Sequence, residues 1–305
     1  MEGWRDDDVA GEDLAPIYRV VRDAGLTDPV LIVALDGWVD AGLGASTALQ
    51  LIIDTADTEV VASFDTDRFI DQRARRPVAR IVNGITTELV WPDLRVLAGQ
   101  DDVGQDFLLL TGPEPDFHWH RFVAAVVDLA LQFEVRMVVG LGAFPAPAPH
   151  TRAIKLAATA PEDSTDLIER VGMVRGEIEV PAGITFAIEL AMGDVGVPML
   201  TLWARVPHYV AAMAFPEAAA ALLQGLTHAS GITFDTSSLR QAADVSRRQV
   251  DELIQANPEH VAMVRSLEAT IDESEGNPFG LEDLPSGDEL AAELEQFLRD
   301  EGGNT

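Results

Sequence analysis

The 305-residue sequence has no cysteine and a single lysine. Without cysteine, the chain has no disulfide, no thiolate nucleophile and no cysteine ligand for zinc or an iron–sulfur cluster. Lys155 has no glycine-rich loop before it and no Walker sequence occurs, so the usual phosphate-binding loop is absent. The sequence also has no run of about 18 apolar residues and no N-terminal signal pattern. We therefore expect a cytoplasmic protein that is neither exported nor inserted in a membrane.

Positive charge is scarce as well. The chain carries 21 Lys and Arg against 51 Asp and Glu, a formal net charge of −30. Such a field repels phosphate backbones and anionic membranes, so we expect no nucleic-acid partner. One cluster gathers basic side chains, namely Arg73, Arg75 and Arg76. It is either an anion-binding or interface patch or, as we favour, a set of cations paired with the excess of acids within or between subunits.

Two kinds of apolar segment alternate along the middle of the chain. Residues 29–35, 107–111 and 135–141 are short and apolar on both faces, as buried parallel strands are. Residues 41–53 and 119–133 have the composition and flanking residues of helices packed on a sheet. This alternation predicts the α/β class, with an open, mainly parallel sheet flanked by helices.

Three regions follow from these patterns. An acidic arm, 1–28, precedes an α/β core, 29–235. An acidic helical region, 236–305, ends the chain with sixteen Asp or Glu against five Arg. Its amphipathic helices are either a covering layer on the core or a subunit contact.

Turn and cap residues predict finer features. Asn83-Gly84 predicts a hairpin between strands at 79–83 and 87–91. Asn257 followed by Pro258 predicts the start of a helix. Ser286 has the capping-box spacing for one more helix near the C-terminus.

Polar residues gather just after the predicted strands, at the edge where open α/β sheets bind ligands. The candidate acids or bases are Asp36, Asp40 and His150. The candidate ligand-binding residues are Gly37, Trp38, Gly112, Glu114, Asp116, Gly142 and Arg152. Together they predict one pocket lined by carboxylates, a histidine and an arginine. The alternative is that glycine and proline only turn the chain here while the aspartates cap helices.

No cofactor and no metal are predicted. The glycine patterns at 42–47 and 140–145 depart from the dinucleotide fingerprint, since the first lacks its third glycine and the second has proline where the helix should open. His118 and His120 are two residues apart, so on a helix their side chains diverge, and packing at the helix start is the favoured interpretation. No serine lies in a Gly-x-Ser-x-Gly elbow, so a hydrolase triad has no support.

The order of the motifs resembles the actinobacterial branch of the proteasome assembly chaperone 2 family, over residues 28–270 or so. The resemblance rests on Pro29–Gly42, Asp71-x-Arg73 with Arg76-Pro77, Leu110–Asp116 before Trp119, Gly140–Ala143, Pro149–Arg152 and Pro207–Tyr209. It implies a sheet similar to that of purine nucleoside phosphorylases, an extra C-terminal helical region and a homo-oligomer, with a trimer favoured.

The resemblance also bears on function. Characterised relatives help to assemble proteasomes or engage them through a C-terminal ending of a hydrophobic residue, a tyrosine and any residue. Here the chain ends Glu301-Gly302-Gly303-Asn304-Thr305, without that ending, so we do not expect docking by this tail. We favour a non-catalytic, oligomeric scaffold or assembly chaperone that binds protein partners.

Two alternatives to the scaffold stay open. The first is a hydrolase or phosphorylase for a small anionic compound, with Asp36 or Asp40 as acid or base, Arg152 holding the anion and His150 assisting. The second is a ligand sensor that uses the same crevice without chemistry. We lean away from an enzyme.

Overall fold

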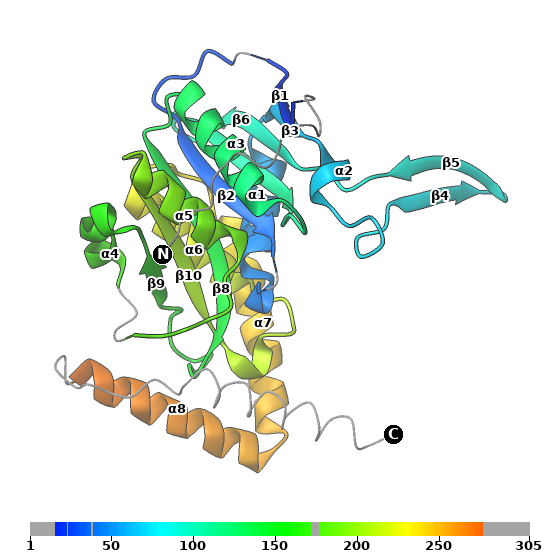
Figure 1. The fold of residues 1–305 in the computed structure, drawn as a ribbon. Coiled ribbons are helices and arrows are strands. Elements are labelled where there is room, and N and C mark those ends of the chain that lie inside the picture. The colour runs from blue at the N-terminus through cyan, green and yellow to red at the C-terminus, as the bar shows by residue number, and fades with distance from the viewer. Residues whose placement is uncertain (1–15, 23, 38, 173–176, 277–305) are drawn as a thin grey trace.

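The computed structural model describes residues 16–22, 24–37, 39–172 and 177–276. These residues contain an eight-stranded sheet in the order β1-β3-β6-β7-β2-β8-β10-β9 (Figure 1). In chain order its strands are β1 (Tyr18–Val20), β2 (Val30–Asp36), β3 (Glu59–Phe64), β6 (Arg95–Gln100), β7 (Asp106–Pro113), β8 (Met137–Ala146), β9 (Leu156–Thr159) and β10 (Met199–Pro207).

The centre of the sheet is parallel. β2 pairs in parallel with β7 on one side and β8 on the other, and β8 pairs in parallel with β10. The outer strands β6, β3, β1 and β9 pair antiparallel. The predicted α/β class, with an open sheet flanked by helices, is therefore confirmed. The sheet begins earlier than expected, because β1 lies inside the predicted arm, 1–28.

Helices cover both faces of the sheet. On the first face are α1 (Gly44–Thr55), α6 (Pro216–Ser230) and α7 (Ser237–Gln255), and on the second are α3 (Trp119–Gln132) and α5 (Ile184–Asp194). In β2, Val30 and Ile32 belong to the core of the first face, while Leu31 and Val33 belong to that of the second. Because successive side chains of a strand point to opposite faces, a strand that is apolar at every position is buried on both.

The last described helix is α8 (Pro258–Gly276). Asn257 precedes it as predicted, and its Oδ1 accepts a hydrogen bond from the N–H of Glu259 at 2.9 Å. Figure 1 shows α8 lying across the lower end of the sheet. The helix predicted after Ser286 lies outside the described residues. Within the part of the chain that the structure describes, no helix has the length and apolar character needed to cross a membrane.

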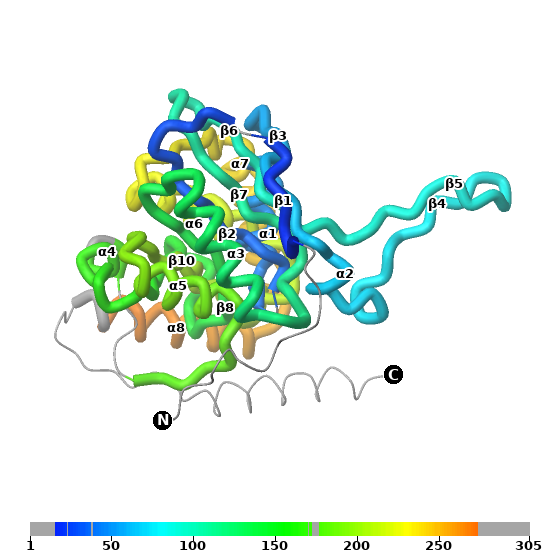
Figure 2. Tube along the Cα trace, turned by 45° about the horizontal axis from the view of Figure 1, so that its top comes forward, coloured from blue at the N-terminus to red at the C-terminus, as the bar shows by residue number. Residues whose placement is uncertain are grey.

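A two-stranded ribbon leaves the body after the short helix α2 (Thr66–Phe69). Its strands β4 (Val78–Val82) and β5 (Ile85–Val90) pair antiparallel. Asn83 and Gly84 join them at φ of 52° and 81°, the left-handed conformation that favours Asn-Gly in a hairpin turn. Figures 1 and 2 show the ribbon projecting away from the sheet. All residues of both strands are exposed.

Candidate functional site

Asp36 ends the central strand β2 and lies at the carboxyl edge of the sheet. Partial burial of its carboxyl group raises its pKa, and the nearby charge of Asp40 raises it further, while Arg75 lowers it. None of the described residues donates a hydrogen bond to this carboxylate, although the backbone carbonyl of Asp36 accepts one from Glu114 at 3.0 Å. Among the predicted acids, Asp36 is thus the one with an unengaged side chain within the described chain.

Asp40 has a different role. Its Oδ1 accepts the N–H of Ala45 at 2.8 Å, and its Oδ2 accepts the N–H of Ser46 at 2.9 Å and the Ser46 hydroxyl at 2.5 Å. These groups belong to the first turn of α1, whose N–H groups have no partner inside the helix. Asp40 therefore caps the helix, as the alternative interpretation of the sequence held.

Glu114 follows β7 and is buried. Its Oε1 accepts the N–H of Ile184, the first residue of α5, at 2.5 Å. A carboxylate at a helix N-terminus satisfies a free N–H and interacts favourably with the helix dipole. Glu114 is thus a long-range cap for α5, with Gly37 packed beside its carboxylate.

The other predicted glycines allow close packing. Gly112 has φ of +127°, and a Cβ there would lie 2.2 Å from the carbonyl oxygen of Asp93. At Gly142 a Cβ would lie 2.4 Å from the ring of Trp203. Both positions require glycine because another part of the chain lies against the backbone there, the Asp93 carbonyl in one case and the Trp203 ring in the other. The approach of a ligand is not needed to explain either glycine.

The basic cluster is partly paired within the chain. Arg75 forms an ion pair with Asp116, and Asp116 Oδ2 also accepts the N–H of Asp71 at 2.8 Å. Arg73 and Arg76 are exposed. One of the three arginines therefore pairs internally, as favoured from the sequence, and closes the loop that leads into the β4–β5 ribbon.

His150 lies in the loop after β8 and is 1% exposed. Its Nδ1 is 2.7 Å from the Tyr209 hydroxyl, and its Nε2 is 3.0 Å from Asp251 Oδ1 in α7. The Tyr209 oxygen also accepts the backbone N–H of His150 at 2.7 Å. Because the Asp251 carboxylate can only accept, the His150 ring donates from Nε2, and in the neutral tautomer that fits this arrangement Nδ1 accepts the Tyr209 hydroxyl proton. Burial is the main cause that raises the pKa of Tyr209 to about 12.

Arg152 turns to α8. Its Nη2 lies 2.8 Å from Asp272 Oδ2, its Nε donates to Asp272 Oδ1 at 3.0 Å, and its Nη1 lies 3.3 Å from Glu268 Oε1. The hydroxyl of the preceding residue, Thr151, donates to the same Glu268 carboxylate at 2.5 Å. Three successive residues, 150–152, thus hold α7 and α8 against the core.

The predicted site residues therefore fall into two groups. Asp36, Asp40 and Glu114 lie around the ends of β2 and β7, whereas His150 and Arg152 engage the C-terminal helices. No hydrogen bond or ion pair between described residues links His150 to the first group. Trp38 lies outside the described residues. Groups of acids and histidines suited to a metal ion are also absent from the described chain.

Sequence reasoning missed a second buried acid. Glu189 in α5 is 5% exposed, and its Oε2 accepts the hydroxyls of Thr201 at 2.8 Å and Thr159 at 2.9 Å. Burial raises its pKa, while the two hydroxyls act in the opposite direction. Trp203 donates its indole N–H to Thr159 at 3.1 Å. The sequence feature that could have revealed it is a single glutamate in the interior of an apolar helix, because a buried carboxylate needs polar partners.

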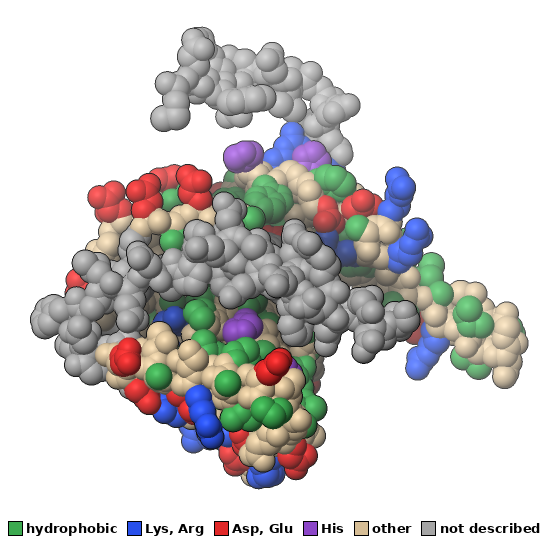
Figure 3. All heavy atoms as spheres, turned by 90° about the horizontal axis from the view of Figure 1, so that it is seen from below, with side chains coloured by type: hydrophobic (Ala, Val, Ile, Leu, Met, Phe, Trp, Pro, Cys, Tyr) green, Lys and Arg blue, Asp and Glu red, His purple; other side chains and the backbone are tan. Residues whose placement is uncertain are grey.

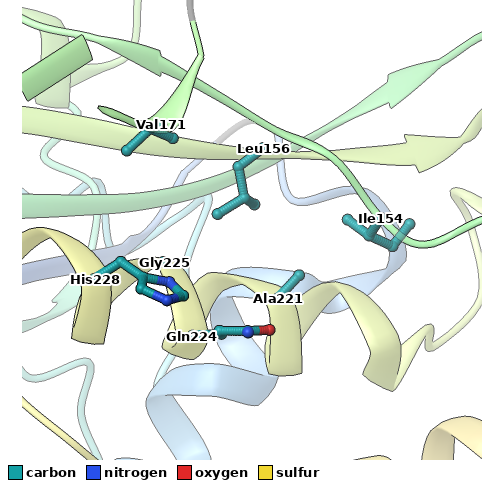
Figure 4. Close-up of a pocket in the computed structure, with 7 residues that line it drawn as sticks. All are labelled: Ile154, Leu156, Val171, Ala221, Gln224, Gly225 and His228. Atoms are coloured by element: carbon teal, nitrogen blue, oxygen red, sulfur yellow. The ribbon is translucent and has the colours of Figure 1, made fainter. Parts of the chain in front are cut away.

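A cavity of about 450 Å³ is lined by none of these residues. Figure 4 shows α6 on one side of it and β9 with its flanking segments on the other. Its lining residues are Ile154, Leu156, Val171, Ala221, Gln224, Gly225 and His228. The lining is mainly apolar, and none of the predicted site residues belongs to it.

The fold and the strand-end residues define an α/β protein whose polar side chains at the carboxyl edge of the sheet mainly hold its own helices. The chain belongs to the PAC2 family, whose sequence model matches residues 34–254. No curated protein matches it.

Solved structures agree with this assignment. A protein of unknown function from Corynebacterium glutamicum is 31% identical, with a TM-score of 0.79 over 87% of this chain and 99% of that one. A proteasome-assembly chaperone homologue from Mycobacterium tuberculosis is 30% identical, with a TM-score of 0.71 over 77% and 99%. A PAC2 family protein from Streptomyces avermitilis is 30% identical, with a TM-score of 0.70 over 78% and 100%.

Proposed function

We propose that this chain is a non-catalytic, assembly-chaperone-like scaffold that binds protein partners. The proposal rests on one observation, namely that most of the polar residues at the sheet edge contact helices of the same chain. Asp40 and Glu114 cap helices, and His150 and Arg152 hold the C-terminal helices. Two of the three candidate acids or bases, Asp40 and His150, are thus engaged within the chain, as are the candidate ligand-binding residues Glu114 and Arg152, which supports a structural role for them.

The relatives support a protein partner. The Mycobacterium tuberculosis relative, at 30% identity, is described as a proteasome-assembly chaperone homologue. An archaeal proteasome activator from Pyrococcus furiosus shares the fold at 19% identity and a TM-score of 0.57. We extend the chaperone-like role to this chain and infer that its partners include proteasome subunits or proteins of similar assemblies.

The proposal includes self-association and assigns different roles to the core and to the C-terminal region. We propose a cytoplasmic homo-oligomer, with the trimer favoured by the family resemblance. The α/β core, 29–235, forms the scaffold, and the acidic region, 236–305, faces partners. α7 supports a covering role for the start of that region, because its Leu239 and Val250 belong to the core of the first face.

One observation favours a second candidate, a hydrolase, phosphorylase or ligand sensor at the sheet edge. Asp36 lies where open α/β sheets bind ligands, and its raised pKa and unengaged carboxylate suit a group that exchanges a proton or a hydrogen bond. Arg152 fits this candidate less well, because an anion there would compete with Asp272 and Glu268.

The partner proposal is tested with purified full-length chain and unassembled proteasome subunits of the same organism. Native mass spectrometry should show a complex of defined stoichiometry, and the yield of assembled rings should rise. Absence of a complex, with ring yield unchanged, would contradict this partner class.

The second candidate is tested by thermal unfolding with nucleosides, nucleotides, phosphate and divalent metals. A ligand at about a hundred times its Kd adds about 2.7 kcal/mol of stability, which shifts Tm by several degrees. A shift that Asp36→Ala abolishes would establish a ligand site and count against the scaffold. Equal Tm across the panel in both proteins would count against the ligand site.

A further inference from the structure

We propose that the carboxyl end of β10 carries a binding site for a small organic anion, a carboxylate or phosphate on an aromatic or apolar body. The groups that bind the anion are Arg205 and Lys155, and the aromatic side chains beside them are Trp203 and Phe144. The inference goes beyond the proposed scaffold. It also differs from the second candidate function, because the alternation of β2 places Asp36 on the first face of the sheet, and this site lies on the second.

Arg205 is a half-buried arginine without an acid partner. Within the described chain, its guanidinium group forms no hydrogen bond and no ion pair. Burial lowers its pKa, and no described charge counteracts that effect. Each other arginine that the structure describes as half-buried pairs with an acid, namely Arg68, Arg75, Arg95, Arg152 and Arg247. A desolvated charge without a partner is costly, so this exception indicates an anion from outside the described chain.

The one lysine of the chain lies directly opposite Arg205. The antiparallel register pairs Ala204 of β10 with Leu156 of β9. It continues by one residue, because the N–H of Arg205 donates to the carbonyl oxygen of Lys155 at 3.1 Å. Opposed residues project to the same face, where two like charges destabilise the pair. A carboxylate or phosphate between the two cations removes this repulsion and fits the planar guanidinium group.

Aromatic side chains lie beside the two cations. In β10, Met199 belongs to the core of the second face and Leu200 to that of the first, so the alternation places Trp203 and Arg205 on the second face. Phe144 of β8 is opposite Arg205 in the parallel register. Both aromatic side chains are half-buried. They therefore offer apolar contacts to the body of a ligand whose charged group is held by the cations.

Trp203 is held in one position by its neighbours. Its ring stacks on that of Phe186 in α5, with 5.4 Å between the centroids and an interplanar angle of 20°. It also lies against the backbone of Gly142, where a Cβ would come within 2.4 Å of the ring. Its indole N–H donates to the Thr159 hydroxyl, which in turn donates to the buried Glu189 carboxylate. Such a side chain is preorganised, which reduces the entropy lost on binding.

The position and the charge of the chain favour a small ligand. Figure 1 shows β9 and β10 side by side at one edge of the sheet, and the carboxyl ends of strands are where open α/β sheets bind small molecules. Figure 3, seen from below, shows Asp and Glu side chains on several parts of the surface. The net charge of −30 repels nucleic acids and anionic membranes, whereas a small anion needs to meet only the two cations.

Isothermal titration calorimetry of the full-length chain tests the site with benzoate, phenyl phosphate, inorganic phosphate and benzyl alcohol. One or both aromatic anions should bind, and the tighter of the two identifies the anionic group. Inorganic phosphate should bind more weakly than phenyl phosphate, because it has no ring to contact Trp203 and Phe144. Benzyl alcohol, which has the ring without the charge, should give no measurable binding.

Matched variants locate the binding. Arg205→Met should weaken the binding of the aromatic anions by about 10-fold or more, since hydrogen bonds to a charged group are lost. Phe144→Leu should weaken phenyl phosphate but not inorganic phosphate. The control is Arg121→Met, which removes an exposed arginine of α3 and should bind like the unmodified chain.

Each outcome decides the proposal. No binding of either aromatic anion, or equal binding in Arg205→Met, would overturn it, as would binding that Asp36→Ala abolishes and Arg205→Met retains. Circular dichroism should show that Arg205→Met folds, with a Tm equal to or above that of the unmodified chain, because a desolvated charge is removed. A fall of several degrees would show that Arg205 has a partner within the chain and would also overturn the site. Because proteasome subunits are absent from these measurements, the scaffold is tested separately.

Discussion

Strand β2 and the β4–β5 ribbon have similar β-branched, apolar compositions but opposite environments. Every residue from Val30 to Ala34 is at most 3% exposed, whereas every residue of the ribbon is exposed. In the body, His150 and Glu114 pair their polar groups, and one buried side-chain oxygen, Glu217 Oε2 in α6, has no hydrogen-bond partner among the described residues. At the root of the ribbon, both amide atoms of Gln72 are buried and have no hydrogen-bond partner among the described residues. The body buries its apolar strand on both faces, whereas the ribbon leaves its apolar side chains exposed.

The largest expected effect on stability comes from truncating one isoleucine of β2 to alanine, compared with the same change in the ribbon. Ile32→Ala in β2 creates a cavity at a site that is fully buried, and should lower the free energy of unfolding by about 2–5 kcal/mol. Ile81→Ala in the ribbon removes atoms already in water and should change it by less than ~0.5 kcal/mol. Urea unfolding of dilute protein measures both. Equal losses would show that the ribbon packs on its own chain.

Tyr209→Phe tests the paired interior of the body. The variant leaves the His150 N–H and Nδ1 without their partner, and should destabilise the fold by about 1–3 kcal/mol. The wild-type protein should also lose stability as the pH rises from 10.0 to about 12, because unfolded tyrosine ionises near 10.0 whereas Tyr209 stays protonated in the fold. Urea unfolding across this range should show a smaller loss in Tyr209→Phe. An identical loss would contradict this role of the hydroxyl.

Gln72→Met tests the segment that leads into the β4–β5 ribbon. It replaces a buried amide that has no partner among the described residues with an apolar side chain of similar size. The monomer should gain up to about 1 kcal/mol, since the desolvation cost of the amide disappears. Urea unfolding measures the gain. A loss of stability in dilute protein would show that the amide is already satisfied within a single chain.

Asp36→Asn should produce the smallest effect, a modest rise in Tm at neutral pH. The raised pKa means that the ionised carboxylate destabilises the fold above the ordinary value of 3.8, so removing its charge helps there. The gain should vanish below pH 3.8, where the carboxyl is protonated in both the folded and the unfolded state. Asp40→Ala is the matched control and should lose about 1 kcal/mol as a helix cap. Comparable losses in both variants would refute the distinction between them.

Local sequence patterns predicted the central strands β2, β7 and β8 and the helices α1 and α3, but not α5. The segment 29–35 is apolar at every position because both of its faces are buried, and that signal is local. Asn83-Gly84 likewise predicted the hairpin from turn conformation alone. The exposure of the hairpin was not predictable, because β-branched composition is shared by buried and exposed strands.

The site could be predicted only in part, since its contacts join distant positions. α5 begins after Gly183 without a Ser, Thr, Asp or Asn cap, and its cap is Glu114, 70 residues earlier. His150 contacts Asp251, which lies 101 residues later in the sequence. The sequence placed both residues at the sheet edge, but the helices that they hold depend on tertiary packing.

Hydrogen exchange of the full-length chain at low and high concentration tests most directly whether the backbone of the buried body is protected and that of the exposed β4–β5 ribbon is not. The amides of β2 should exchange slowly at both concentrations, since exchange there requires global unfolding. The amides of β4 and β5 should exchange rapidly in dilute protein, because the two strands pair only with each other and all of their residues are exposed. Strong protection of the β4 and β5 amides in dilute protein, or rapid exchange of the β2 amides, would contradict this division.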